Sequence, residues 1–405
     1  MVHSMNRVVD INSDIPIDRI VDANVYDLGG TDQDFLLAWK AVQDASPYSL
    51  MWTPRNGGHW IVLRGAEIAN IFEDHHKFSS RAVLVPKSWA EAYQVIPTTL
   101  DPPDHTPYRK RIHAALTPAT VEAARPAIQK LAEQAVTEVL PLGHCDFIRD
   151  VATKLPLAVF LKIAELSHTN VSDLPGYNTP LTDAQGNRNG EDTMARFAEY
   201  LRPHCAKHLK TPKAGFLDRL IGESSNGAAL PLEDAVDMAT TMMTGGIDTV
   251  ISSLGLIMAH LAKEDSLRHS LVQEPDLIPK AVRELLRRCP IMTKARLVTE
   301  ECTIDGITLK PGEMVVLPPL HGLDERVFDD PLTVDIHRPA APNLTFGAGV
   351  HRCPGSLLAI AEIEILLHCW LRYIPDFKID PTRPMVSQAG VLGSVQSLDL
   401  IWPKQ

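Results

Sequence analysis

Cys353 lies in a glycine-rich segment that leads into an apolar run, and it is the first candidate for chemistry in the chain. The segment reads TFGAGVHRCPG over residues 345–355 and is followed by SLLAIAEIEILLHCWLRY. The sequence predicts that Cys353 lies at the start of a helix, with Pro354 in the first turn, where a missing N–H costs little. The free N–H groups and the dipole at that end stabilise an anion, so we expect a thiolate there.

The glycines at positions 347, 349 and 355 permit tight turns and a close backbone approach to a flat ligand. A glycine-rich loop around an incidental buried cysteine is the alternative, and for an isolated Gly-x-Gly it would be preferred. The full spacing Phe-x-x-Gly-x-x-x-Cys-x-Gly, which begins at Phe346, favours a loop shaped around a ligand.

Two other groups of polar residues lie in helix-like segments. Glu284 and Arg287 are three apart in AVRELLRR and share a helix face, although most such pairs are solvated surface pairs. His105 and Arg109 are four apart in DPPDHTPYRKR, and both can donate hydrogen bonds to a carboxylate. Exposure to solvent would explain this second pair equally well.

A long apolar run, LEDAVDMATTMMTGGIDTVISSLGLIMAHLAKE, predicts a helix with Gly245, Gly246, Asp248 and Thr249 in its middle. Each interior glycine costs about 1 kcal/mol relative to alanine. Close helix packing would explain the glycines, but not the acid and the alcohol beside them.

The composition bounds the partners of the protein. The chain has 405 residues and a net charge of −11, which argues against nucleic acid as a partner because phosphate binders need a basic surface. The first forty residues contain neither a signal-type apolar core nor an 18-residue apolar run, so we expect an unanchored, cytoplasmic protein without a membrane partner. The six cysteines lack the spacing of a zinc site, and we expect neither structural zinc nor a disulfide framework.

The arrangement of patterns predicts a mainly α protein with small β-sheets. Two apolar runs around Asn56-Gly57-Gly58 predict a hairpin over residues 48–65. Helical spacing dominates residues 117–171 and 230–289, and short alternating stretches after Pro290 predict a second strand region. Residues 321–350 form a long irregular stretch that leads to Cys353 and indicates a functional loop. We found no repeat and no linker, and we expect a single domain over residues 1–405.

The string FGAGVHRCPG resembles the haem-binding signature of the cytochrome P450 superfamily. The resemblance implies a triangular-prism helical fold and haem b bound between a distal helix and the cysteine loop, with Cys353 as the iron ligand. Phe346, Gly347, His351 and Gly355 would contact the haem. No Cys-x-x-Cys-His is present, so covalent attachment is excluded.

The same resemblance gives roles to the other groups. Glu284 and Arg287 match the Glu-x-x-Arg of the superfamily, with Arg338 as its third member, and all three would support the haem pocket. Gly245 and Gly246 would leave room for dioxygen, while Asp248 and Thr249 would deliver protons. The groups expected at the haem propionates are His105, Arg109, Arg296 and His351.

The stretches EAYQVIPTTLDPP, GGIDTV, GLDER and WLRYIPDFKI are most similar to the bacterial camphor-hydroxylase branch. Tyr93 matches a tyrosine that hydrogen-bonds the camphor ketone, and Thr98, Val391 and Leu392 match pocket positions. Leu84, Thr241, Thr244 and Met292 also fall at pocket positions but differ from the residues of that branch. Lys294 stands where the branch has an acid near a propionate, and it could pair with the propionate or face solvent.

The implied activity is hydroxylation of a small hydrophobic molecule of monoterpenoid size by O2. The electrons would come from a separate two-iron ferredoxin and its reductase. We expect an acidic ferredoxin to meet the basic cluster Arg109, Lys110, Arg111 and Arg352. A peroxygenase is an alternative, against which the Asp248-Thr249 pair argues, and a non-catalytic haem sensor is another.

Overall fold

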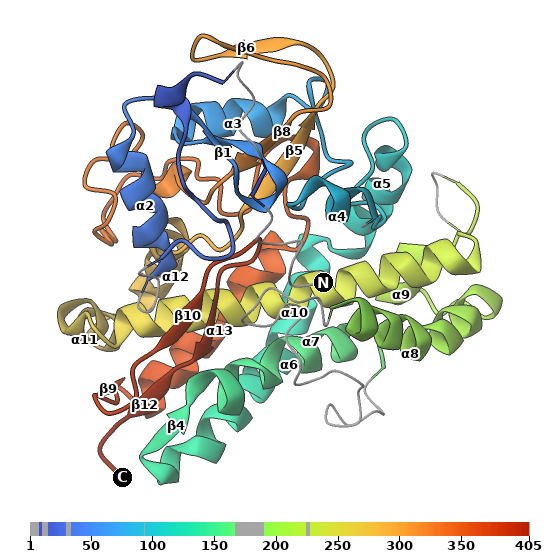
Figure 1. Cartoon of the computed structure of the whole chain (residues 1–405). Helices are drawn as coiled ribbons and strands as arrows, with labels where there is room; N and C mark the ends of the chain where they lie inside the picture. The colour runs from blue at the N-terminus through green and yellow to red at the C-terminus, as the bar shows by residue number, and fades with distance from the viewer. Residues whose placement is uncertain are drawn as a thin grey trace.

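The computed structural model describes residues 8–9, 15–29, 34–92, 94–166, 190–223 and 227–404. Helices dominate, as predicted, and they surround small sheets that gather mostly around the N-terminal part of the chain (Figure 1). The helices are α2 (Phe35–Ala45), α3 (Gly65–Glu73), α4 (Lys87–Ala92), α5 (His105–Ala115), α6 (Pro118–Val139), α7 (Lys154–Ile163), α8 (Gly190–Lys210), α9 (Phe216–Ile221), α10 (Leu232–Leu261), α11 (Asp265–Gln273), α12 (Ile278–Arg288) and α13 (Ser356–Tyr373).

Shorter helical turns connect these helices. They are η1 (Ile17–Arg19), η2 (Arg55–Gly57), η3 (Leu140–Leu142), η4 (Ile148–Ala152), η6 (Pro275–Leu277), η7 (His321–Leu323) and η8 (Gly349–His351). The last two are the helical turns within residues 321–350, which otherwise form the irregular stretch that the sequence predicted.

The strands form four sheets in the described part of the chain, and the largest has the order β1-β2-β8-β5-β3. The strands are β1 (Leu50–Thr53), β2 (His59–Val62), β3 (Phe78–Ser79), β4 (His144–Asp146), β5 (Lys294–Val298), β6 (Cys302–Ile304), β7 (Ile307–Leu309), β8 (Met314–Leu317), β9 (Lys378–Ile379), β10 (Val386–Gln388), β11 (Ser394–Ser397) and β12 (Asp399–Ile401). The predicted hairpin is confirmed, since β1 and β2 pair with Leu50 opposite Val62. Asn56 and Gly57 turn the chain with positive φ angles of 50° and 86°.

Residues 117–171 were predicted as helix, and the prediction missed an interruption. Helix α6 ends at Val139, because Pro141 and the left-handed Gly143 stop it. Strand β4 follows and pairs with β12 at the far end of the chain. Helix α7 then resumes at Lys154 and ends at Ile163.

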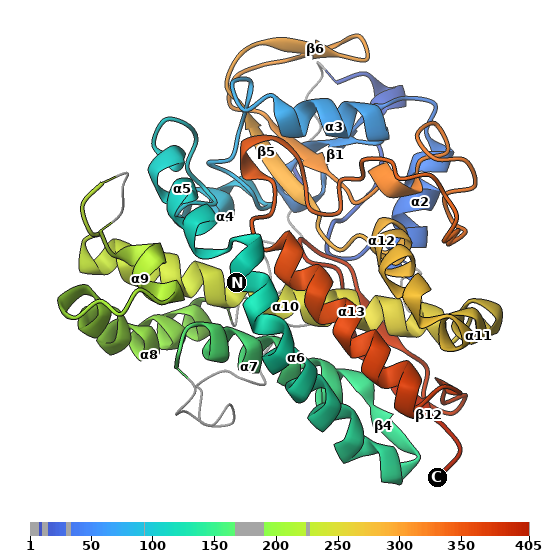
Figure 2. The ribbon, with the colours of Figure 1, turned by 180° about the vertical axis from the view of Figure 1, so that it is seen from behind.

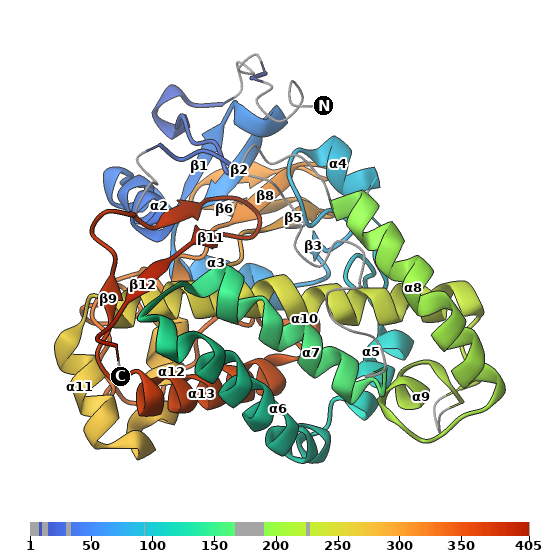
Figure 3. The same cartoon turned by 90° about the horizontal axis from the view of Figure 1, so that it is seen from below.

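Helix α10 crosses the molecule and packs against α7, α8, α9 and α13 (Figure 3). It is the one helix in the described residues long and apolar enough to span a membrane, but 61% of its apolar window is buried inside the fold. This burial is the pattern of a core helix rather than a lipid-facing one. Figure 2 shows α6 and α13 lying side by side, in front of α10 in that view.

The two ends of α10 belong to different hydrophobic clusters. Its first half packs into a cluster formed with α5, α7, α8 and α9, and its second half packs into the larger cluster of the sheets, α6, α12 and α13. The segment from Gly245 to Thr249 lies where one cluster gives way to the other. The residues with possible chemistry on α10 are therefore placed deep in the molecule.

Candidate active site

The cysteine loop is held against helix α3 by its own backbone. The Cys353 N–H donates to the Phe346 carbonyl at 2.8 Å, and Gly347 and Gly349 take left-handed φ angles of 68° and 64°. A Cβ at Gly349 would lie 2.6 Å from the Phe72 carbonyl oxygen, so no larger residue fits there without movement. The glycines therefore serve the loop geometry, as the spacing predicted.

The helix after the loop begins later than the sequence predicted. Helix α13 starts at Ser356 with Gly355 as its N-cap, so Pro354 lies before its first turn. Burial raises the pKa of the Cys353 thiol. The Gly355 N–H and the charges of Arg109, Lys294 and Arg352 lower this pKa, but burial has the larger effect. The N–H at the helix start does favour the thiolate, as predicted, but burial of the sulfur outweighs this effect. Coordination to a metal ion would have to drive deprotonation.

Cys353 and Thr249 line the same cavity of about 340 Å³, between α10 and the cysteine loop. The walls come from α5, α7, α10, α13 and β5, and most of the predicted site residues lie on them. The predicted residues on the cavity wall are Thr98, His105, Arg109, Thr241, Gly245, Gly246, Thr249, Met292, Arg296, Phe346, Gly347, His351, Cys353 and Gly355.

The α10 wall is open beside the two glycines. A Cβ built on Gly245 or Gly246 meets no atom within 4 Å, so close helix packing does not explain these residues. The Thr249 hydroxyl donates to the Gly245 carbonyl at 2.7 Å, across one turn of the same helix. Asp248 is half-buried and is not among the cavity-lining residues.

Basic side chains line the cavity near the cysteine loop. The rings of His105 and His351 lie 4.4 Å apart, and the Nε2 atom of each is buried without a hydrogen-bond partner. Burial lowers the pKa of His105 to about 4 and that of His351 to about 3, so both rings are neutral. Arg109 donates to the Arg352 carbonyl, and to His113 at 3.1 Å.

Strand β5 adds two more cations, Lys294 and Arg296. Burial and the neighbouring Arg296 charge lower the pKa of Lys294 to about 8. The Arg296 guanidinium donates to the Ala295 carbonyl at 2.9 Å and lies 5.3 Å from the centre of the Phe72 ring. The alternative that Lys294 faces solvent is wrong, because its side chain lines the cavity.

One acid on the cavity wall was missed by the sequence reasoning. Glu362 of α13 is buried, its Oε2 atom has no hydrogen-bond partner, and burial raises its pKa to about 8. The acid is therefore neutral near pH 7. A glutamate inside the apolar run SLLAIAEIEILL was the available signal.

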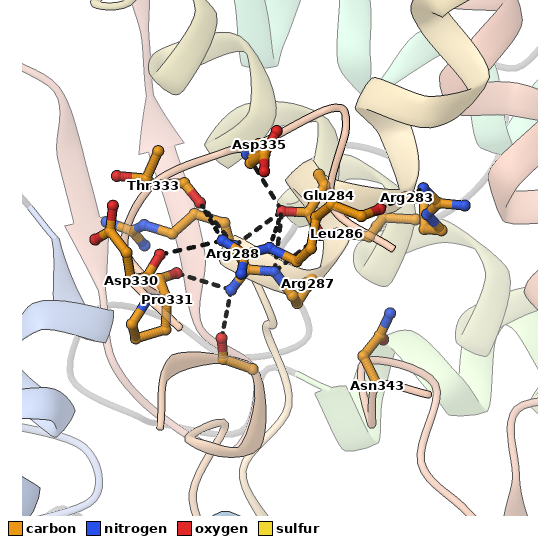
Figure 4. A network of polar contacts seen from close by, with 12 residues as sticks. Arg283, Glu284, Leu286, Arg287, Arg288, Asp330, Pro331, Thr333, Asp335 and Asn343 are labelled. Carbon is orange, nitrogen blue, oxygen red and sulfur yellow. Dashed lines mark hydrogen bonds and ion pairs between the residues drawn. The ribbon is translucent and has the colours of Figure 1, made fainter. Parts of the chain in front are cut away.

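Glu284 and Arg287 lie in a buried polar network with the irregular segment (Figure 4). Arg338 of that segment joins the network through an ion pair with Glu284. Glu284 Oε2 accepts from Arg287 Nε and from Arg338 Nε, each at 3.1 Å. Arg287 also donates to the carbonyls of Gly322 at 2.5 Å and Pro331 at 2.7 Å. The explanation of Glu284 and Arg287 as a solvated surface pair is wrong, because their side chains are only 4% and 1% exposed.

The helix of this network also contacts the cysteine loop. The Thr345 hydroxyl donates to the Leu286 carbonyl of α12 at 2.7 Å, and Thr345 lines the cavity. The network therefore fixes both the irregular segment and the start of the loop relative to α12.

Comparison with known proteins identifies the family. Residues 187–388 match the family model of cytochrome P450. The chain is 30% identical to the cyclomarin C epoxidase CymV of Salinispora arenicola (strain CNS-205), over 67% of this chain and 71% of that protein. It is also similar to the crystal structures of CYP101J2 (34% identity, 98% and 100% of the chains covered, TM-score 0.88) and CYP101C1 (32%, 97% and 100%, TM-score 0.91). The chain belongs to the cytochrome P450 family. It is a P450 monooxygenase with the P450 fold, and the cofactor of the family is iron protoporphyrin IX.

The residues around the P450 cavity fit this cofactor. Haem carries two carboxylates, and the described wall offers three cations, Arg109, Lys294 and Arg296, beside two unpartnered histidine nitrogens. The one described acid on the wall, Glu362, is neutral near pH 7. The glycine positions on α10 leave the space beside the helix free, and a cysteine sulfur is a suitable iron ligand.

The predicted substrate residues are placed unevenly. Thr98, Thr241 and Met292 lie on the cavity wall, whereas Val83 lies there rather than Leu84. The Thr244 hydroxyl donates to the Thr240 carbonyl at 2.9 Å, and Thr244 is not among the lining residues. Val391 and Leu392 run beside the wall, with Leu392 bridged to Met292 and the Val391 carbonyl accepting from Thr293. Tyr93 lies outside the described residues.

The basic cluster expected at the surface contains one buried member. Arg111 is 6% exposed and donates to the Gly222 carbonyl at 2.5 Å and to the Ala228 carbonyl. It ties α5 to the segment after α9 and cannot meet a partner protein. Lys110 and Arg352 are exposed, and Arg109 is half-buried.

Proposed function

We propose that this P450 hydroxylates a compact, largely apolar molecule of monoterpenoid size. The reaction is R–H + O2 + 2e− + 2H+ → R–OH + H2O, with electrons from a two-iron ferredoxin and its reductase. The observation that carries the proposal is the single cavity that Cys353 shares with Thr249 of α10. The likeness to CYP101J2 and CYP101C1 over almost the whole chain supports a place near the camphor-hydroxylase branch.

In this proposal Cys353 would hold the iron of haem b through its sulfur. Haem iron supplies oxygen activation, and a thiolate ligand promotes O–O cleavage. His105, Arg109, Arg296 and His351 donate to the propionates, and Phe346, Gly347 and Gly355 shape the cysteine side. Gly245 and Gly246 keep the α10 side open, which agrees with the free space at both positions. The ion pairs of Glu284 with Arg287 and Arg338 support the backbone that forms the pocket.

Thr249 and Asp248 are the proposed proton-delivering pair. The Thr249 hydroxyl rests on the Gly245 carbonyl, and rotation about its Cα–Cβ bond turns the same O–H toward the cavity. Asp248, the preceding residue of α10, is half-buried and is not among the cavity-lining residues. This placement suits a carboxylate that collects protons and passes them to the threonine hydroxyl.

The substrate proposal rests on the balance of apolar and polar wall residues. Val83, Phe160, Ile291 and Met292 bury apolar surface at about 25 cal/mol per Å², which gives affinity but little orientation. Thr98 and Thr241 add polarity, and Tyr93 is the proposed donor to a ketone or ether oxygen. The proposed pocket also includes four residues that do not line the cavity directly: Leu84, Thr244, Val391 and Leu392. CymV is named for epoxidation of cyclomarin C, so the substrate does not transfer from that relative.

The partner proposal rests on Lys110 and Arg352, which are exposed near the cysteine loop of an otherwise acidic chain with a net charge of −11. An acidic ferredoxin would be steered toward this local basic surface. We propose that the enzyme works in the cytoplasm, where such carriers are found.

The test begins with the carbon monoxide difference spectrum of the reduced protein. Wild type and the control Cys302→Ala should give the thiolate-type band, and Cys353→Ala should lose it together with product formation. Cys302 is a suitable control because it is half-buried on β6, remote from the cavity. Retention of the thiolate-type band by Cys353→Ala would exclude the ligand assignment.

Terpenoids that shift the spin state are then assayed for product. Product with ferredoxin, reductase and O2, and none with hydrogen peroxide alone, supports the monooxygenase. Product with peroxide alone would indicate the peroxygenase. Spectral shifts without any product would indicate a sensor.

A further inference from the structure

Lys294 and Arg296 project from one face of strand β5. They are two residues apart and pair in register with Leu317 and Val315 of β8, so their side chains point the same way. Both line the cavity. The strand therefore presents two cations side by side to whatever occupies this end of the cavity.

No carboxylate in the described part of the chain forms an ion pair with Lys294. The charge of Asp101 acts on Arg296, but its oxygens are bound to Ser79 and Ser80, and its ion pair is with Arg81 at 3.9 Å. Glu362, the described acid on the wall, is neutral near pH 7. Lys294 is half-buried, and the anion on the described cavity wall that acts on it is the Cys353 thiolate, which the proposed site commits to iron. The Lys294 ammonium therefore has no carboxylate partner among the described residues and can meet one from a ligand in the cavity.

We propose that Lys294 binds a haem propionate directly, beside the one on Arg296. This inference rests on the proposed haem site and deepens it. With Arg109, three cations then face two carboxylates, which leaves excess positive charge at the haem edge. The excess favours the electron-rich ferrous haem over the ferric form, so Lys294 also raises the reduction potential of the iron.

The test measures haem retention, which does not depend on turnover. Haem transfer from the holoprotein to apomyoglobin is followed for wild type, Lys294→Met and Lys130→Met. Lys130 is an exposed lysine of α6 and serves as the matched control. We expect Lys294→Met to release haem faster on the order of tenfold, the worth of one charge-assisted hydrogen bond, with Lys130→Met equal to wild type. The potential of Lys294→Met should be lower than that of wild type.

Haem dimethyl ester, which lacks the carboxylate charges, supplies the second arm. With it, wild type and Lys294→Met should release cofactor at the same rate. A difference that persists with the ester would show that the lysine acts on packing rather than on a propionate, and would overturn the proposal.

The apoprotein supplies the third arm. Removing a half-buried charge that lacks a carboxylate partner should raise the Tm of the Lys294→Met apoprotein, and the Tm increase on haem binding should become smaller. A lower apoprotein Tm with unchanged haem release would overturn the proposal. A second result would also overturn the proposal. If Lys294→Met released haem at the wild-type rate but no longer showed a spin-state shift with an anionic terpenoid acid, Lys294 would bind a substrate carboxylate instead.

Haem release and apoprotein Tm test the role of Lys294 independently of whether the enzyme hydroxylates a terpenoid. A wild-type protein with a thiolate-type carbon monoxide band but no terpenoid product would refute the substrate proposal. It would leave the haem-release comparison intact.

Discussion

The imidazole rings of His105 and His351 lie in contact, with centroids 4.4 Å apart and planes inclined at 52°. This contact joins the first residue of α5 to the turn η8 just before Cys353. The two Nε2 atoms are both buried and unpartnered, which is costly unless a ligand accepts from them.

We expect His105→Leu and His351→Leu each to speed haem release several-fold, since one neutral hydrogen bond contributes about 0.5–1.5 kcal/mol. Because the rings touch, the effects in the double variant should not add. Apomyoglobin transfer measures all four proteins, and strictly additive effects would show that the two rings act independently. His76→Leu, an exposed histidine, is the control.

Thr249→Ala should uncouple oxygen consumption from product formation. The hydroxyl donates within α10, so its loss should leave the fold and substrate affinity nearly unchanged. NADH consumption should continue while product yield falls and hydrogen peroxide rises. Thr240→Ala, on the same helix but not on the cavity wall, should keep wild-type coupling. Equal coupling in the two variants would refute the role of Thr249.

Charge reversal should have different effects at the exposed Lys110 and Arg352 and at the buried Arg111. Lys110→Glu and Arg352→Glu should slow reduction by ferredoxin at low ionic strength, with the difference shrinking as salt is added. Arg111→Glu should instead lower Tm, because it breaks bonds to the carbonyls of Gly222 and Ala228. Stopped-flow reduction and thermal unfolding distinguish these effects. Rates that are independent of salt in all variants would remove the support for an electrostatic docking surface.

His59 should make the protein sensitive to acid. Burial lowers its pKa to about 3 from the ordinary 6.5, and both ring nitrogens lack partners. Below pH 6.5 the unfolded state therefore binds a proton that the folded state does not, so stability falls as the pH falls toward 3. The loss from this group at pH 4.5 is about 2 to 3 kcal/mol. His59→Leu should flatten the dependence of the urea midpoint on pH between 6.5 and 4.5, and an unchanged dependence would contradict the assignment.

The cysteine loop could be predicted from the sequence because local backbone geometry determines it. Left-handed φ angles at Gly347 and Gly349 favour glycine, and both glycines lie within six residues of Cys353 in the sequence. The Glu284 network was expected only through the resemblance to the P450 superfamily, because Glu284 and Arg287 by themselves have the spacing of an ordinary surface pair. The helices within residues 117–171 and 230–289 followed from apolar periodicity. Strand β4 did not, because its three residues are specified by pairing with β12.

Burial of single charges could not be predicted in the same way. Arg111 adjoins exposed Lys110 in the sequence, yet it is buried and donates to the carbonyls of Gly222 and Ala228. Lys294 and Glu362 are likewise directed into the cavity by packing between distant segments. For such residues the sequence shows the charge but not the surroundings that determine its effect.

Arg287 and Arg338 hold the irregular segment by donating hydrogen bonds to its main-chain carbonyl oxygens. Arg287 donates to Gly322, Pro331 and Thr333, and Arg338 donates to Asp329 and Asp330. Every amino acid carries such an oxygen, so these hydrogen bonds depend little on the side chains of the accepting residues. They depend strongly on the path of the backbone. Positions that contribute only a carbonyl, such as Asp329 and Pro331, should therefore tolerate substitution, whereas a change in the length of the segment would displace these oxygens. A library that randomises its exposed positions should retain bound haem in most members, and single-residue deletions there should abolish it.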